Sequence, residues 1–122
     1  MKYMLLVYLD EQAQSDTERE HCYVESAQLA QDLSSSGKYL SAGPLHPTAT
    51  ATSVRVRNGK RLVTDGPFAE TREQLGGYYL IDARDLDEAL SIAERVPVAK
   101  LGTIEIRPVL DIKGLPAKVE EK

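Results

Sequence analysis

The sequence contains no tryptophan, one phenylalanine and a single cysteine, Cys22. One cysteine cannot form a disulfide bond within the chain. The two histidines stand alone, with no Cys/His cluster at the spacing that zinc sites use. The apolar runs lie far below the roughly 18 residues that a membrane-spanning helix needs. These absences exclude an internal disulfide and argue against a metal site and a membrane span.

Basic residues are outnumbered, with 15 Lys and Arg against 19 Asp and Glu and a formal net charge of −4. Binding to nucleic acid requires a basic face that neutralises phosphates, so we expect no direct nucleic-acid partner. Neither a glycine-rich nucleotide loop at the start of a helix nor a Gly-x-Ser-x-Gly motif occurs. We therefore expect no cofactor.

The composition that is present, 42% hydrophobic and 28% charged over 122 residues, is typical of one globular domain. We expect this domain to cover residues 1–110, followed by a charged tail over residues 111–122. The first ten residues have no small-residue cleavage site, so they do not indicate a signal peptide. The predicted location is the cytoplasm.

Apolar periodicity predicts alternating strands and helices. The predicted strands cover residues 3–9, 38–41, 77–82 and 103–109, and the predicted helices cover residues 18–36 and 86–95. Asn58-Gly59 lies between two alternating runs and predicts a tight β-hairpin. Two strand–helix–strand units in so small a chain predict a ferredoxin-like α+β sandwich with an inserted β-hairpin.

Local signals give the expected ends of the first helix. Ser15, Asp16 or Thr17 can cap its start, and Thr17 with Glu20 has the spacing of a capping box. Gly37 is expected to end the helix in the left-handed conformation.

Three groups of apolar side chains are expected to be buried inside the protein. Cys22, Leu29 and Leu33 form the apolar stripe of the first helix. Phe68 is expected to anchor the Asp-Gly-Pro-Phe turn. The inward side chains of the second helix are expected to be Leu86, Ala89, Leu90 and Ala93.

Two of the predicted strands, residues 3–9 and 77–82, are apolar on both faces. Two helices can cover only one face of the sheet, so a second element must cover the other. A second copy of the sheet is the economical choice, which predicts a homodimer. The alternative is a monomer that keeps one apolar patch exposed.

Four sequence blocks carry a family resemblance. Residues 62–79 read LVTDGPFAETREQLGGYY, and shorter blocks are MKYMLL at residues 1–6, ATATSVR at 49–55 and GTIEIRPV at 102–109. Together they resemble the YCII-related proteins of the DGPF-domain type over nearly the whole chain up to about residue 109. The resemblance implies the dimeric α+β barrel, in which two ferredoxin-like sheets pack face to face.

The resemblance implies less about activity than about fold. Barrel relatives include lactone isomerases, small monooxygenases and dehydrochlorinase-like enzymes, and also ligand sensors that catalyse nothing. Some DGPF-type members lie beside extracytoplasmic-function sigma factors, which implies a link to transcription.

His46 and Asp65 are the predicted catalytic pair. His46 stands before Pro47 in a loop at a strand end, where an imidazole can act as general acid or base. Asp65 opens the Asp-Gly-Pro-Phe turn and can orient His46 or take a proton from a carbon acid. The alternatives are a loop histidine bonded to backbone and a turn aspartate bonded to amides.

Three more residues are predicted to bind substrate. YCII-type members carry a functional histidine on the first helix, and counting back from Ala42 places its counterpart nearest Ser26 rather than His21. Ser26 can hydrogen-bond a ligand, or it can be a small buried residue bonded to its own helix. Glu70 can supply charge to the same cleft. Arg107 is placed on the same strand face as Glu105, either as exposed polar groups or as a pair inside the barrel.

Two functions remain open. The first is an enzyme without metal or cofactor that transfers protons on a small carbonyl or lactone-like compound. The second is a ligand-binding or regulatory dimer that catalyses nothing and is linked to a sigma factor.

Overall fold

The computed structural model describes residues 1–116. The strands are β1 (Lys2–Leu9), β2 (Tyr39–Pro44), β3 (Thr52–Arg57), β4 (Lys60–Asp65), β5 (Gln74–Asp82) and β6 (Thr103–Pro108). The helices are α1 (Asp16–Ser35) and α2 (Leu86–Ala93), with short 3₁₀ turns η1 (Thr48–Thr50) and η2 (Pro97–Lys100). No helix in this part of the chain is both long and apolar enough to span a membrane.

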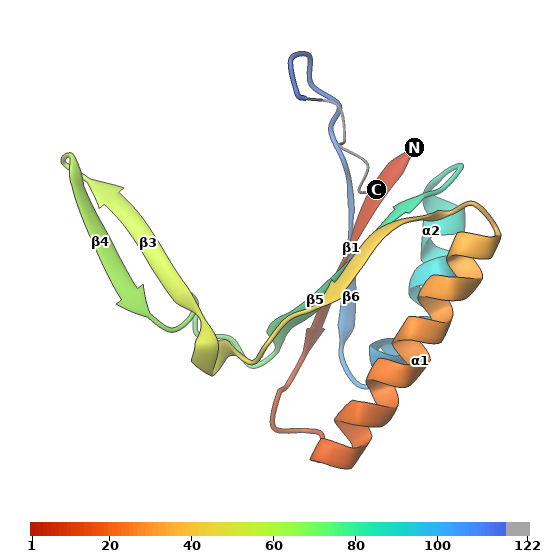
Figure 1. The fold of residues 1–122 in the computed structure, drawn as a ribbon, viewed down its shortest axis with the longest axis horizontal. Coiled ribbons are helices and arrows are strands. Elements are labelled where there is room, and N and C mark those ends of the chain that lie inside the picture. Colours follow the sequence, from red (N-terminus) through yellow and green to blue (C-terminus); the bar gives the residue numbers. More distant parts are fainter. Residues whose placement is uncertain (117–122) are drawn as a thin grey trace, which may run out of the picture.

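Four strands form the main sheet in the order β2-β5-β1-β6, and every neighbouring pair is antiparallel. Both helices pack on one side of this sheet, while the β3–β4 hairpin stands on the other side (Figure 1). This is the ferredoxin-like order, and it confirms the predicted α+β sandwich with an inserted hairpin.

The core lies between the sheet and the helices. Alternate residues of the two central strands point into it, because side chains along a strand alternate between its faces. The helices contribute Leu29, Leu33, Ala89, Ile92 and Ala93. The strands contribute Tyr3, Leu5, Val7, Tyr79 and Ile81, all of them buried.

Helix α1 begins two residues earlier than predicted. Ser15 is its N-cap, and the Ser15 hydroxyl accepts a hydrogen bond from the Glu18 amide at 3.1 Å. The Glu18 carboxylate accepts one from the Ser15 amide in return, so the capping box is Ser15 with Glu18 rather than Thr17 with Glu20. Gly37 ends the helix with a φ of 74°, as predicted.

Helix α2 buries only part of the side that was predicted, since Ala89 and Ala93 are buried as expected. Ala89, Ile92 and Ala93 are buried, whereas Leu86 and Leu90 are exposed, so the inward placement of these two leucines is wrong. The helix is only eight residues long, and its small residues allow close approach to the sheet.

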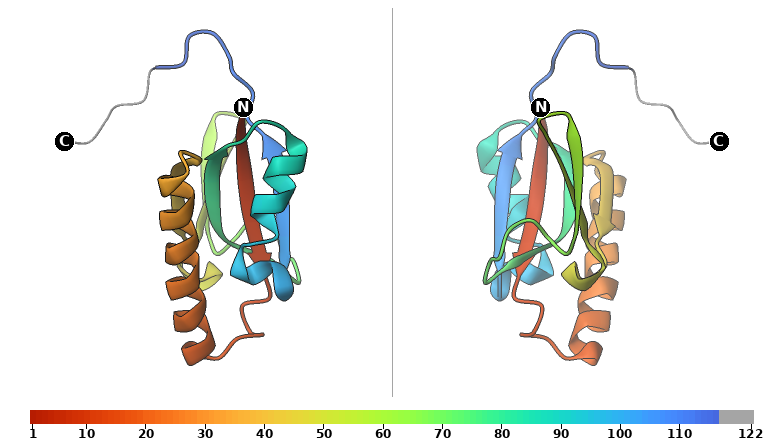
Figure 2. Two further views of the ribbon diagram at one scale, coloured as in Figure 1. Left: turned by 90° about the vertical axis from the view of Figure 1, so that its right-hand side faces the viewer. Right: turned by 90° about the vertical axis from the view of Figure 1, so that its left-hand side faces the viewer.

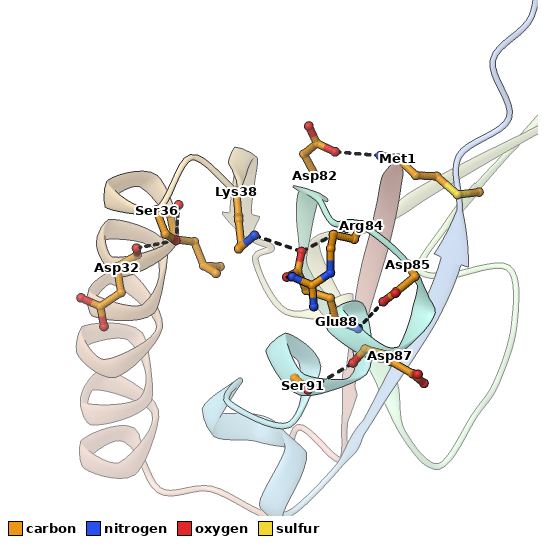
Figure 3. A network of polar contacts seen from close by, with 11 residues as sticks. Met1, Asp32, Ser36, Lys38, Asp82, Arg84, Asp85, Asp87, Glu88 and Ser91 are labelled. Atoms are coloured by element: carbon orange, nitrogen blue, oxygen red, sulfur yellow. Dashed lines mark hydrogen bonds and ion pairs between the residues drawn. The ribbon is translucent and has the colours of Figure 1, made fainter.

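A polar network anchors the start of α2 (Figure 3). The Asp85 carboxylate caps the helix by accepting from the Glu88 amide at 2.9 Å. Glu88 in turn binds Lys38 at 3.0 Å and Arg84 at 2.9 Å, which ties α2 to the residue just before β2. These bonds, together with that of the Arg84 amide, hold the pKa of Glu88 below its ordinary value of 4.5.

The hairpin forms at the predicted turn. Asn58 and Gly59 have φ values of 52° and 73°, the conformation that a two-residue hairpin turn requires. The apolar anchor predicted at Phe68 is wrong, because this side chain is 79% exposed. Residues 69–73 form no helical turn, and β5 begins at Gln74.

The sheet face opposite the helices is here called the open face. Strand register places Met4, Leu6, Tyr78 and Leu80 on it, and all four are partly exposed. Figure 2 shows the hairpin and its connecting segments on this side of the sheet, with both helices on the other side. The predicted two-sided apolar strands are therefore present, and one of their faces is uncovered in the single chain.

Candidate functional site

A pocket of about 320 Å³ opens between α1 and the helix-covered face of the sheet. Val7, Ala42 and Tyr79 form its sheet wall, and Cys22, Tyr23 and Ser26 form its helix wall. The walls are mainly apolar, with a few polar groups, which is the usual character of a small-molecule site.

The two walls are tied together by Tyr79. Its hydroxyl donates to the Ser26 carbonyl at 3.1 Å, and burial raises the pKa of Tyr79 above its ordinary value of 10.0. Tyr79 therefore stays protonated and holds α1 at a fixed distance from β5. The Ser26 hydroxyl has no hydrogen-bond partner within residues 1–116, so the alternative of a bond to its own helix does not apply in the described chain.

Glu11 lines the pocket and joins three segments. Its carboxylate oxygens accept from the Thr48 amide at 3.1 and 3.2 Å. Its amide donates to the Gln74 side chain at 3.0 Å, and its carbonyl accepts from Arg19 at 3.3 Å. Because these bonds hold it in place, the Glu11 carboxylate is fixed beside the pocket.

His46 lies in the loop between β2 and η1 and lines the same pocket. The loop is held to the sheet by the Leu45 amide, which donates to the Gly76 carbonyl at 2.9 Å. His46 is exposed, so its imidazole is open to solvent and to an entering ligand. The pocket thus brings together His46, Ser26 and Glu11.

The other predicted site residues lie elsewhere in the single chain. Asp65 ends β4 opposite Thr52 at the base of the hairpin, and Glu70 is exposed in the following loop. Neither lines the pocket, and the same holds for Arg107. The roles predicted for these three residues stay predictions.

Strand register decides where Glu105 and Arg107 point. Glu105 pairs with Leu6 and Arg107 with Met4, so both lie on the open face and not toward the helices. Glu105 accepts a hydrogen bond from the Tyr8 hydroxyl at 3.3 Å. Partial burial and then the nearby Glu105 carboxylate raise the pKa of Tyr8 above 10.0.

Sequence reasoning missed Glu11, Arg19 and Tyr23 at the pocket. Glu11 lies in the loop after strand β1, a position where functional side chains are common. No local pattern predicts the bond from Glu11 to Thr48, because 37 positions separate the two residues. Among residues 1–116, no three His, Cys, Asp or Glu side chains gather as a metal site would require.

The fold and the pocket define a small α+β domain with a ligand-sized cavity beside its longer helix. The family model described as the YCII-related domain matches residues 1–113, and the chain belongs to this family. The predicted family is therefore confirmed. The boundary predicted at residue 110 stays a prediction, and residues 117–122 of the predicted tail lie outside the described residues.

Known proteins similar to this chain include a curated relative and a solved structure. The uncharacterized protein R00369 of Rhizobium meliloti (strain 1021) is 42% identical over 118 residues, covering 89% of this chain and 92% of that protein. The solved structure of 5-chloro-2-hydroxyhydroquinone dehydrochlorinase (TftG) from Burkholderia phenoliruptrix AC1100, in complex with 2,5-dihydroxybenzoquinone, has a TM-score of 0.55 and 17% identity. The match covers 93% of this chain and 97% of the dehydrochlorinase chain. At 17% identity the similarity shows a shared fold.

Proposed function

We propose that the protein is a small-molecule enzyme that transfers protons on a carbonyl or lactone-like compound without a metal or an organic cofactor. The observation that carries this proposal is the pocket between α1 and the sheet, where His46 and Glu11 lie at one cavity. The dehydrochlorinase of similar fold, which binds a small quinone, adds support for a small-molecule substrate.

His46 is the acid–base group in this proposal. Its neutral imidazole removes a proton from the carbon beside the carbonyl, the electron pair moves onto the carbonyl oxygen, and the imidazolium returns the proton at another position. Glu11 stabilises the imidazolium, and the unpartnered Ser26 hydroxyl donates to the enolate oxygen. Glu11 takes the carboxylate role first predicted for Asp65, because Glu11 lines the pocket. Glu70 and Arg107 have no part in this step.

The test uses isotope exchange from solvent. In D2O, a panel of small carbonyl and lactone compounds is monitored by NMR for deuterium uptake at the carbon acid. We expect His46→Gln to lower the exchange rate by about 10²–10⁴-fold while ligand binding is retained. The control is His21→Gln, because His21 is exposed, pairs with Glu25 at 2.8 Å and does not line the pocket.

A second function, ligand binding without catalysis, is favoured by the mainly apolar walls of the pocket. It predicts that a compound raises the melting temperature of the wild-type protein while no compound in the panel exchanges protons. Such a result would contradict the enzyme proposal and leave a binding or regulatory protein. The sigma-factor link and the cytoplasmic location stay predictions.

We further propose that the working form is a homodimer. The support is the open face, where Met4, Leu6, Tyr78 and Leu80 remain partly exposed in the single chain. A second sheet packed on this face would bury these side chains and bring Glu105 and Arg107 into the space between the two sheets.

A further inference from the structure

The β3–β4 hairpin, residues 52–65, is here called the arm. Its register pairs Val54 with Val63 and Val56 with Arg61, so the three valines share one side. The exposed fraction is 63% for Val54, 64% for Val56 and 53% for Val63. A two-stranded hairpin is marginally stable alone in water, and an apolar patch of this kind marks a contact surface. The arm therefore needs a partner to cover its valine side.

Charge indicates the nature of that partner. The arm contains four of the chain's 15 Lys and Arg residues but only one of its 19 Asp and Glu residues. In the rest of the chain, acidic residues therefore outnumber basic ones, and this part carries the net negative charge of the protein. Arg55, Arg57 and Lys60 lie on the side of the arm opposite the valines. A basic arm on an acidic molecule is complementary to a second copy of that molecule.

The position of the arm fits the same partner. The arm leaves the sheet on the side of the open face, away from both helices (Figures 1 and 2). A second copy packed on the open face would lie directly beside it. Each arm strand has six residues, a length of about 20 Å at the usual rise, against about 10 Å between packed sheets. The arm is thus long enough to pass the second sheet and reach the flank of the other protomer.

We propose that the two arms of the homodimer clasp each other's protomer. The valine side of each arm packs on apolar surface of the second copy, and Arg61, which the register places on the valine side, lies against acidic residues of that copy. This inference rests on the homodimer proposed above and adds a second contact to the sheet-to-sheet one.

The experiment is hydrogen exchange of the full chain across a concentration series, with the dimer fraction measured by sedimentation. We expect amides of residues 52–65 to become protected in step with the dimer fraction. Raising the salt concentration should lower both together, because screening weakens the contact between basic arm and acidic body.

A variant pair separates the two sides of the arm. Val54→Asp with Val63→Asp should remove the protection of the arm and raise the dimer dissociation constant at least about tenfold, equal to about 1.4 kcal/mol. Leu62→Asp is the matched control, because Leu62 is exposed on the opposite side of the arm. Far-UV circular dichroism checks that both variants keep the folded body, since these residues lie outside the core.

Each remaining outcome overturns the inference in a distinguishable way. If the protein dimerises while the arm amides stay unprotected, the clasp is wrong and the homodimer stands. If the chain sediments as a monomer at every concentration, both fail. If the monomer's arm becomes protected on adding duplex DNA or an acidic peptide but not on self-association, the partner is of another class and the clasp is wrong.

Discussion

The Glu88 carboxylate shows how a single side chain connects parts of the fold. It binds Lys38 from the segment before β2 and Arg84 from the loop before α2. The hydrogen bond from the Arg84 backbone amide, and then the contacts with the Lys38 and Arg84 side chains, stabilise the ionised form and hold the pKa of Glu88 below 4.5 in the folded protein. A group of this kind adds stability above its unfolded pKa, and that contribution disappears as the pH falls through the folded value.

We expect Glu88→Gln to lower the free energy of unfolding at pH 7, because the neutral amide cannot replace the two ion pairs. The difference from the wild type should shrink below about pH 4.5, where the unfolded carboxyl group becomes protonated. Urea unfolding between pH 3 and 7 measures it. Glu20→Gln is the control at an exposed position, and an equal loss at every pH would contradict the assignment.

Single residues were predictable where the backbone itself demands them. Asn58, Gly59 and Gly37 adopt the positive φ values expected of their turns, because few other residues tolerate that conformation. Glu11 was not predictable, since its role at the pocket depends on Thr48 and Gln74 from distant parts of the chain.

At the scale of the element, helix α1 depends on its first turn. Its N-terminal amides would lack partners without the reciprocal bonds between Ser15 and Glu18. The Ser15 bonds also lower the pKa of Glu18 below 4.5. The first turn carries Arg19, which contacts Glu11 at the pocket, so the cap also positions part of the site.

We expect Ser15→Ala to lower the free energy of unfolding by about 1 kcal/mol, the usual cost of losing a capping side chain. Thr17→Ala is the matched control, because Thr17 lies inside the helix and caps nothing. Chemical denaturation of both variants gives the comparison. A larger loss for Thr17→Ala than for Ser15→Ala would show that the predicted Thr17 box operates in solution.

Elements were predictable in type and order because periodicity reports the face that a chain buries. Periodicity failed for Leu86, Leu90 and Phe68, which are apolar but exposed in the single chain. The pattern identifies apolar side chains without saying what lies opposite them. Which of these residues become buried depends on neighbours that only the assembled fold provides.

At the scale of the whole molecule, the open face is the apolar sheet surface that a single chain leaves uncovered. Met4, Leu6 and Leu80 are partly exposed there, beside the polar Tyr8 and Glu105 pair. Central strands with two apolar faces are typical of sheets that are covered on both sides.

We expect the wild-type protein to sediment at twice the 13.5 kDa chain mass and Leu80→Glu to sediment as a single chain, because two charges would otherwise be buried between the sheets. Val24→Glu is the control at an exposed aliphatic residue on α1 and should remain dimeric. A wild-type particle of one chain mass would refute the homodimer.

Glu11 has one more consequence, which concerns the short segment from His46 to Thr48. This segment leads into the arm at one end and borders the ligand cavity at the other, and the Glu11 carboxylate fastens it to the body. In the proposed dimer, self-association and ligand binding would therefore both act on this backbone segment. By thermodynamic reciprocity, a compound that tightens the pairing of two chains must itself be held more tightly by the pair, and by an equal factor.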